Sequence, residues 1–214
     1  MSSLVLASGN ANKAAEIRPL FAELGIEIVG MGELESGWEV EESGNTLEEN
    51  ARIKARAAAD RTGRTAIADD TGLFVDALDG APGVRSSRYA GPGASYADNV
   101  RKLLEALEGV ATERRTGRFR TVALIVGPGG REIPFEGVLE GQILPAPRGA
   151  GGFGYDPVFL VPALGRSLAE LSLEEKNRVS HRARAFRAAA AFLERHGEWI
   201  PEHEKQLVRR DASR

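Results

Sequence analysis

Two adjacent carboxylates, Asp69 and Asp70, follow a short apolar segment and precede a threonine and a glycine. The segment Thr65–Ala68 predicts a strand that ends at these aspartates, and Gly72 permits a tight turn behind them. Because side chains alternate along a strand, the two aspartates are expected to point to opposite faces. One could then hold a metal ion or a water at the sheet edge, where α/β folds bind ligands. Taken alone, the same residues are more typical of a surface turn.

A second candidate site is the segment Ser8–Lys13, between an apolar strand and a helix. Backbone N–H groups and the helix dipole attract anions at such a junction, and Lys13 adds a full positive charge. Ser8 and Asn10 add hydrogen-bonding groups. The segment is not a P-loop, because it has one glycine and its lysine is not followed by Ser or Thr. The alternative interpretation is a helix N-cap by Asn10 or Asn12 beside a solvated lysine.

The predicted loop at residues 31–45 is acidic and contains Glu39, Glu41 and Glu42. One of these carboxylates could join Asp70 on Mg²⁺, which usually takes one or two carboxylates together with substrate phosphates and waters. The alternative is a solvated acidic loop.

The segment Gly149–Pro157 contains the spacing G-x-G-x-x-G. A dinucleotide-binding fingerprint must lead into a helix, whereas Pro157 and the apolar residues after it predict a strand. We therefore reject the dinucleotide interpretation. What remains is a glycine-rich loop in which Phe153 or Tyr155 could stack on a planar base. The alternative is that both rings pack in the core.

The basic segment at residues 175–182 contains Lys176 and His181. On an ideal helix these two side chains are about 140° apart, so they would not share a face. Both can contact one ligand only if the helix breaks between them, with Ser180 as a new N-cap. His181 and Arg182 would then lie in the first turn of the next helix. The alternative is a solvated basic helix face.

The elements that must position these groups follow from the spacing of apolar residues. The pattern predicts strands at 4–7, 26–29, 65–70, 119–126 and 132–144, and helices at 11–24, 46–61, 95–108 and 172–196. The glycine-rich turn Gly127–Gly130 joins the last two strands as a hairpin. We expect an α/β fold with a mixed, twisted central sheet flanked by helices, in two lobes with a central cleft. Residues 1–196 would form this single two-lobed domain, and residues 197–214 a frayed polar tail.

Composition narrows the class of protein. The chain has 214 residues, of which 42% are hydrophobic and 28% charged, so it can bury a substantial core. No apolar segment approaches the ~20 residues needed to span a bilayer, and no cleavable signal is expected. The absence of cysteine excludes disulfides and thiolate zinc sites and is compatible with a cytoplasmic enzyme. A net charge of −3 argues against a nucleic-acid partner.

Several short motifs occur in order, with ordinary spacing, between residues 3 and 196. They are Ser8-Gly9-Asn10 with Lys13, Glu41–Gly44, Glu49–Ala55, Asp69–Leu73, Gly80–Gly83, Gly152–Pro157 and Ser180–Arg182. Each motif is weak alone, but the ordered set is specific. In this combination the chain resembles the non-canonical purine NTP pyrophosphatases, the inosine-triphosphatase family.

This resemblance implies a two-lobed mixed α/β enzyme that uses Mg²⁺ to hydrolyse ITP, dITP and XTP to the monophosphate and pyrophosphate. It also implies a homodimer that acts on a small nucleotide, with no membrane or nucleic-acid partner. Carried over by position, Glu42 and Asp70 would hold the metal, and Asp70 would be the catalytic acid or base. The residues that would contact the nucleotide are Ser8, Gly9, Asn10, Ala11, Asn12, Lys13, Lys54, Thr71, Phe153, Gly154, Tyr155, Asp156, Lys176, His181 and Arg182.

Within that set, Ser8–Lys13 would bind phosphate and sugar, Phe153–Asp156 would lie beside the base, and His181 and Arg182 would bind the base edge. Donors at that edge favour an oxygen at C6 of the purine over the amino group of adenine. Whether Glu41 or Glu42 leads on the metal stays open. So does the identity of the base, because a cation lowers the pKa of Asp70, leaving Asp69 or a metal-bound hydroxide as alternatives.

Other functions remain to be separated from this one. A related pyrophosphatase that prefers modified pyrimidine nucleotides would be distinguished by a panel of nucleotides. An aspartyl-phosphate phosphatase is disfavoured, because it would need Asp-x-Asp spacing and Asp69 and Asp70 are adjacent. A nucleotide sensor would bind ITP without turnover, which calorimetry with a product assay would show.

Overall fold

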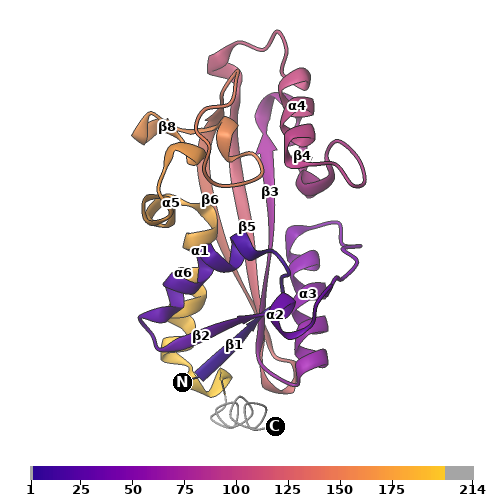
Figure 1. Cartoon of the computed structure of the whole chain (residues 1–214), viewed down its shortest axis with the longest axis vertical. Coiled ribbons are helices and arrows are strands. Elements are labelled where there is room, and N and C mark those ends of the chain that lie inside the picture. The colour runs from indigo at the N-terminus through magenta and orange to yellow at the C-terminus, as the bar shows by residue number, and fades with distance from the viewer. Residues whose placement is uncertain (1, 201–214) are drawn as a thin grey trace. The chain divides into compact units, whose positions relative to one another are not determined.

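The computed structural model describes residues 2–200 (Figure 1). The contacts within the chain divide these residues into two compact units. Unit 1 comprises residues 2–70, 122–136 and 183–200, and unit 2 comprises residues 71–121 and 137–182. The chain therefore passes between the units four times, at 70/71, 121/122, 136/137 and 182/183. Three of these passages lie inside strands, which continue from one unit into the other.

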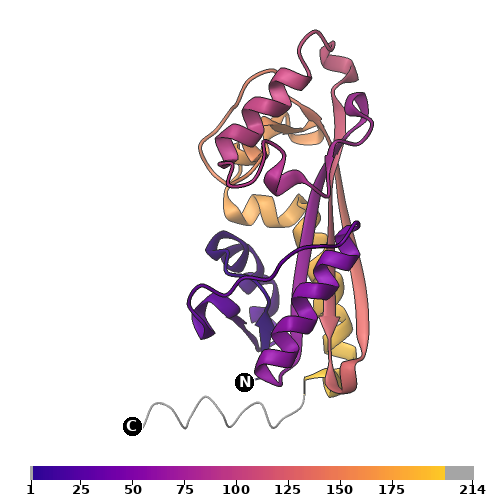
Figure 2. The same ribbon diagram turned by 90° about the vertical axis from the view of Figure 1, so that its right-hand side faces the viewer.

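Unit 1 is built around parallel strands. Its elements are β1 (Ser2–Leu6), α1 (Ala11–Ala22), β2 (Ile26–Gly30), α2 (Met31–Leu34), α3 (Leu47–Thr62), the first half of β3 (Ala66–Val75), the second half of β5 (Thr116–Val126), the first part of β6 (Glu132–Ile143), most of α6 (His181–Arg195) and a 3₁₀ turn at Gly197–Trp199. Strand β1 pairs in parallel with both β2 and β3. The turn that joins β5 to β6 at residues 127–131 can be followed in Figure 2.

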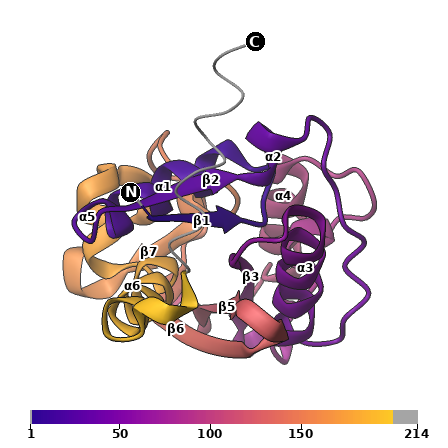
Figure 3. The ribbon, with the colours of Figure 1, turned by 90° about the horizontal axis from the view of Figure 1, so that it is seen from below.

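Helices cover both faces of the sheet in unit 1, with α3 on one side of β3 and β5 and α6 on the other (Figure 3). Helix α6 packs with α1 over a core that includes Leu4, Ile67 and Ile125. The rings of Phe21 in α1 and Phe186 in α6 meet edge to face, with 6.2 Å between centroids. On α3, by contrast, three of the six buried residues are alanines, so this helix can approach the strands closely.

Helix α3 has a well-defined start and end, which matters because it carries site residues. Thr46 Oγ1 accepts a hydrogen bond from the Glu49 backbone N–H, and the Glu49 carboxylate accepts from the Thr46 N–H. This reciprocal capping box is the one that the sequence predicts. The helix ends at Gly63, whose φ of 67° is a left-handed conformation that favours glycine.

Unit 2 is antiparallel. It contains the remainder of β3, β5 and β6, with β4 (Pro82–Gly83), α4 (Tyr96–Ala106), β7 (Phe159–Val161), β8 (Arg166–Ser167), α5 (Leu173–Val179) and short 3₁₀ turns. Strand β4 pairs with β3, and β6, β7 and β8 pair in sequence, all antiparallel. Its core joins residues of β3, α4, β5 and β7, including Leu73, Leu103, Phe119 and Phe159.

The strand order is β2-β1-β3-β5-β6-β7-β8, with β4 beside β3. Parallel and antiparallel neighbours occur in the same sheet, so the predicted mixed α/β fold flanked by helices is confirmed. The central cleft stays a prediction.

Strand β3 differs from its prediction, because it does not end at the aspartates. It continues through Gly72 to Val75, with β4 along its second half. A side chain at Gly72 would lie 2.6 Å from the Gly83 carbonyl oxygen, so this glycine permits close strand packing and not a turn. The acidic pair therefore lies in the middle of a strand, which fixes its direction more firmly than a turn would.

Two further segments differ from the sequence prediction. Residues 31–34 of the predicted loop form the short helix α2. The predicted tail begins at residue 197, but Trp199 and Ile200 are buried in the core of unit 1 because both are apolar. The rest of that tail, 201–214, lies outside the described residues.

Candidate active site

The two aspartates of β3 serve different helices. The Asp69 carboxylate accepts a hydrogen bond of 2.9 Å from the Lys13 ammonium in the first turn of α1. Asp70 instead faces α3, where Lys54 Nζ lies 3.3 Å from Asp70 Oδ1. Both aspartates are buried. The predicted alternation of the pair is therefore consistent with their contacts, since one carboxylate meets α1 and the other meets α3.

Lys54 joins Asp70 to the loop before α3. Its ammonium lies 2.7 Å from Glu42 Oε1 as well as 3.3 Å from Asp70 Oδ1. We call Glu42, Lys54 and Asp70 the acid–lysine cluster. Because one ammonium contacts both carboxylates, the two acids converge on a single point in unit 1.

Asn50 holds this cluster in place. Its amide Nδ2 donates to Asp70 Oδ2 at 3.1 Å, and its Oδ1 accepts from the Gly44 backbone N–H at 2.9 Å. A side chain at Gly44 would lie 2.7 Å from that Oδ1, so the loop reaches Asn50 only because residue 44 is glycine. Asn50 thus ties the loop that carries Glu42 to the strand that carries Asp70.

The electrostatics of the cluster are those of a crowded acidic site with one cation. Burial raises the pKa of Asp70, an effect that the Lys54 ammonium opposes and the Glu42 carboxylate reinforces. Burial alone would lower the pKa of Lys54, but Asp70 and Glu42 outweigh it, so the pKa of Lys54 is raised. Lys54 is therefore charged at neutral pH, and Asp70 has a greater proton affinity than an exposed aspartate.

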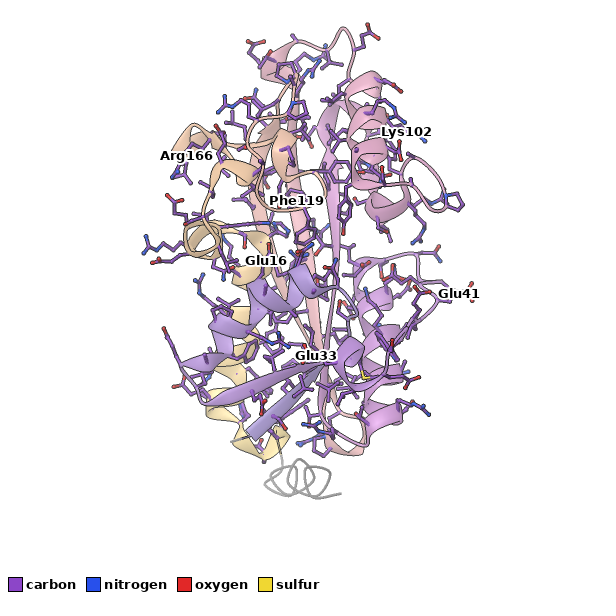
Figure 4. The ribbon with its side chains drawn as sticks, viewed as in Figure 1. Glu16, Glu33, Glu41, Lys102, Phe119 and Arg166 are labelled. Atoms are coloured by element: carbon purple, nitrogen blue, oxygen red, sulfur yellow. The ribbon has the colours of Figure 1, made fainter. Side chains whose placement is uncertain are left out.

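Glu42, and not Glu41, supplies the carboxylate that the loop before α3 contributes to the acid–lysine cluster. Glu41 and Glu39 are exposed, and Figure 4 shows Glu41 on the outer edge of the loop before α3. Glu42 is three-quarters buried, with 24% of its side chain exposed, and bonds Lys54. Glu42 is therefore the member of the cluster, and which of the two glutamates leads on a metal stays a prediction.

The predicted phosphate-binding segment forms the start of α1. Asn10 is the N-cap, and its Oδ1 accepts from the backbone N–H groups of Asn12 and Lys13 at 2.9 and 3.4 Å. Ser8 Oγ accepts from the Asn10 N–H at 3.1 Å. Gly9, between Ser8 and Asn10, is exposed, and so is Ala11, the first residue of α1. The capping interpretation is therefore correct for Asn10, while the contact of Lys13 with Asp69 brings a second ammonium to the aspartate pair.

In unit 2 the glycine-rich loop is held by a buried ion pair. Asp156 Oδ2 accepts from Lys176 Nζ at 2.5 Å and from the Phe153 backbone N–H at 2.8 Å. A side chain at Gly152 would collide with the same carboxylate, at 2.1 Å from Oδ2. Gly154 has a φ of 64°, which also favours glycine. The loop conformation is thus fixed by Asp156 and presents the Phe153 ring.

The two aromatics of this loop have different environments. Tyr155 is buried in the core of unit 2, and its hydroxyl donates to the Ser86 carbonyl oxygen at 2.9 Å. Burial raises its pKa. Phe153 is only partly buried, and the Lys176 and Arg182 cations lie 5.0 and 5.3 Å from its ring centroid. Phe153 is therefore the better candidate for stacking, and the core interpretation applies to Tyr155.

The predicted break at Ser180 is confirmed. Helix α5 ends at Val179, Ser180 is extended, and α6 begins at His181. The His181 ring stacks on Phe119 of β5, with 4.4 Å between centroids and 16° between planes. Arg182 Nη2 donates to Thr71 Oγ1 at 3.3 Å. The break therefore brings Arg182 toward the Phe153 ring that Lys176 also approaches, which a continuous helix would not do.

The predicted residues thus form two groups, one in each unit. Unit 1 gathers Lys13, Glu42, Lys54, Asp69 and Asp70, and unit 2 gathers Thr71, Phe153, Asp156, Lys176, His181 and Arg182. Three residues that contact these groups were not predicted from the sequence, namely Asn50, Phe119 and Thr121. Asn50 had a usable signal, since it lies four residues before Lys54 and shares its helix face.

Comparison with known proteins supplies the family. A family profile described as "Ham1 family" matches residues 4–192. The chain belongs to the Ham1 family. It is 52% identical over 186 residues to the dITP/XTP pyrophosphatase of Caldanaerobacter subterraneus subsp. tengcongensis, covering 86% of this chain and 92% of that protein. A protein of the same name from Symbiobacterium thermophilum is 53% identical over 192 residues, covering 90% and 93%.

A solved Ham1-family structure agrees in fold. The HAM1 protein from Coxiella burnetii superposes with a TM-score of 0.81 at 45% identity, covering 90% of this chain and 98% of that one. The resemblance stated from the sequence motifs is thereby confirmed. Within residues 2–200 of this Ham1-family chain, none of the helices has the length and apolar character required to cross a bilayer.

The donor set of the acid–lysine cluster suits Mg²⁺. Its carboxylate oxygens are the ligands that this ion prefers, and Glu42 and Asp70 already converge on one cation, the Lys54 ammonium. Across the described part of the chain, no group of three or more acidic or histidine side chains is placed to hold a metal. Two carboxylates are the usual protein contribution when substrate phosphates complete the magnesium shell.

Proposed function

We propose that this chain hydrolyses the purine nucleoside triphosphates ITP, dITP and XTP to the monophosphate and pyrophosphate, in a Mg²⁺-dependent reaction. Its Ham1-family relatives carry the name dITP/XTP pyrophosphatase at about half identity over most of the chain. The observation that carries the proposal is the acid–lysine cluster, because it combines convergent carboxylates with a buried ammonium beside a second lysine.

Glu42 and Asp70 would hold the magnesium ion, with substrate phosphates and waters as the other ligands. When bound, the ion neutralises phosphate charge and lowers the barrier to attack by water. The described geometry fits this role, since buried Asp70 and partly buried Glu42 lie beside one lysine and burial raises the pKa of Asp70. A cation would relieve the repulsion between them.

The protein's own groups would supply positioning and charge, which dominate phosphoryl-transfer catalysis. Lys54 and Lys13 would face the phosphates, and Asn10 with Ser8 would fix the start of α1 next to them. Asp70 would accept the proton of the attacking water. Burial raises the pKa of Asp70 against the opposing Lys54 ammonium, and a raised pKa favours a general base. Asp69 is committed to Lys13 at 2.9 Å, so we infer that it positions the lysine.

Unit 2 would bind the base. Phe153 offers a ring for stacking, and Lys176 and Arg182 lie at that ring with hydrogen-bond donors. These side chains have donors and no acceptors, so they favour the C6 oxygen of hypoxanthine or xanthine over the C6 amine of adenine. His181, stacked on Phe119, would act at the same edge.

Three further properties belong to this proposal. The resemblance supports a homodimer, the absence of cysteine is compatible with a cytoplasmic location, and the substrate is a free nucleotide with no membrane or nucleic-acid partner.

A nucleotide panel with Mg²⁺ tests the function. We expect pyrophosphate release from ITP, dITP and XTP at much higher kcat/KM than from ATP, GTP or pyrimidine triphosphates. Removing the metal with EDTA should stop the reaction, and adding Mg²⁺ should restore it. Equal rates on all purines, a preference for pyrimidines, or binding without turnover would each contradict the proposal.

A further inference from the structure

Two threonines and an arginine of unit 2 form a linear hydrogen-bonded group that reaches the base-binding side chains. Thr121 Oγ1 on β5 lies 2.7 Å from Thr71 Oγ1 on β3. Thr71 Oγ1 also accepts a hydrogen bond from Arg182 Nη2 at 3.3 Å. We call these three residues the threonine–arginine group. Each of them borders a passage of the chain between units, at 121/122, 70/71 and 182/183.

Thr121 is an unusual residue for its place. It is fully buried, and the rest of β5 from Val122 to Val126 is buried and apolar. A hydroxyl in such surroundings is costly unless it is hydrogen-bonded. Valine has nearly the same shape and would fill the space without that cost. The oxygen of Thr121 therefore serves to form a hydrogen bond in a fixed direction and is not needed to fill space.

The hydrogen bond with Thr121 determines the orientation of the Thr71 hydroxyl. A guanidinium can only donate, so Thr71 must present a lone pair to Arg182. On its other contact, Thr71 either gives its hydrogen to Thr121 or receives one from it. In both arrangements the bond to Thr121 fixes the rotation of the Thr71 hydroxyl. Without it, that hydroxyl can turn its hydrogen toward the guanidinium and repel it.

Arg182 is held between two features of unit 2. One is the Thr71 hydroxyl, and the other is the Phe153 ring, whose centroid lies 5.3 Å from the guanidinium carbon. The guanidinium is buried with the rest of the side chain, at 4% exposure. Its donors are thus aimed by the threonine on one side and the ring on the other, and a small loss of either contact changes where they point.

We propose that Thr121 is a positioning residue for purine discrimination, which acts on Arg182 through Thr71. The proposal rests on the proposed function, in which Arg182 favours the C6 oxygen of the base. Loss of the Thr121 hydroxyl then weakens the binding of 6-oxo purines. The binding of 6-amino purines stays nearly unchanged, because they gain nothing from Arg182.

The matched variants are Thr121→Val, which removes the oxygen at constant shape, and Thr121→Ser, which keeps it. We expect Thr121→Val to lower kcat/KM for ITP about five- to ten-fold, mainly through KM, the size of one lost hydrogen bond between neutral groups. The value for ATP should change less than about two-fold, so selectivity falls. Thr121→Ser should retain wild-type selectivity. If Thr121 had only a structural role, Thr121→Val would instead lower kcat/KM for ITP and ATP by the same factor, because less of the protein would be active.

A double-mutant cycle tests the route through Thr71. In a Thr71→Val background, Thr121→Val should have no further effect on ITP selectivity. Additive effects of the two substitutions would overturn the proposal, as would wild-type selectivity in Thr121→Val or a loss confined to kcat. If Thr121→Val does not fold, Thr121→Ala provides the hydroxyl-free variant, measured per mole of folded protein. Failure of the proposed function is seen separately, in wild-type protein that releases no pyrophosphate from ITP.

Discussion

Lys54 is the residue on which the acid–lysine cluster depends most, and Lys54→Met tests that dependence. Methionine keeps much of the length and the apolar stem of lysine but removes the ammonium. In the wild type that ammonium lies 2.7 Å from Glu42 and 3.3 Å from Asp70, in a residue with 8% exposure. The substitution leaves the two carboxylates converging with no cation between them.

The size of the effect follows from these distances. Each contact carries about 5 kcal/mol of Coulomb attraction at an effective dielectric constant of about 20. Desolvation of the buried groups offsets much of this, and the 24% exposure of Glu42 admits water. We therefore expect Lys54→Met to lower the free energy of unfolding by about 2–4 kcal/mol, toward the low end of what breaking a buried ion pair costs. Turnover of ITP should fall by about 100-fold or more, the usual cost of losing one positioned donor.

Urea unfolding followed by tryptophan fluorescence, with and without Mg²⁺, measures the change in the free energy of unfolding. The matched control is Arg56→Met, which removes a cation from an exposed part of the same helix, where Arg56 pairs with Glu132. It should cost less than about 1 kcal/mol. Mg²⁺ should stabilise Lys54→Met more than the wild type, because the unpaired carboxylates gain more from it. A Lys54→Met protein as stable and as active as Arg56→Met would refute the reasoning.

Three other substitutions follow from single contacts. Asp70→Asn should reduce ITP turnover by more than about 1,000-fold while circular dichroism stays that of the wild type, and retained activity would remove Asp70 from the mechanism. The pKa of Glu175 is lowered to about 2 by hydrogen bonds from Arg166 and from a backbone N–H, so its stabilisation is present above its ordinary pKa and is lost as pH falls toward about 2. Glu175→Gln should thus be less stable than the wild type at pH 6, with the difference shrinking by pH 2.5 in urea unfolding; a difference independent of pH would contradict this. Tyr155→Phe should cost about 1–2 kcal/mol of stability by leaving the Ser86 carbonyl without its hydroxyl donor, and should change KM for ITP by less than about two-fold; a large KM change with unchanged stability would place Tyr155 at the substrate instead.

Local sequence rules predicted those parts of the site that depend on the geometry of a single helix or strand. The angle between Lys176 and His181 required a break at Ser180 if both contact one ligand, and the structure has this break. The capping box at Thr46 fixed the start of α3 and so the position of Lys54. Alternation along a strand sent Asp69 and Asp70 to different helices. In each case the deciding interaction spans only a few residues of sequence.

Features set by distant contacts could not be predicted in this way. The Asp-Thr-Gly residues of β3 resemble a turn, but β3 continues past them, where Leu73 and Phe74 pair with the distant strand β4. Glu41 and Glu42 are equivalent in sequence, and the hydrogen bond from the Gly44 backbone N–H to Asn50 Oδ1 decides which of them faces Lys54. Trp199 resembled part of a polar tail because its neighbours are charged, yet its own surface is apolar and packs in the core.

The most direct test of the account is the identity of the products of ITP turnover, followed by ³¹P NMR with Mg²⁺ for the wild type and Asp70→Asn. We predict that the wild type converts the three triphosphate signals into those of the monophosphate and pyrophosphate in equal amounts, and that Asp70→Asn leaves the triphosphate unchanged over the same time. Accumulation of the diphosphate and orthophosphate, or the same products at the same rate from Asp70→Asn, would contradict the assignment of the acid–lysine cluster as the catalytic centre.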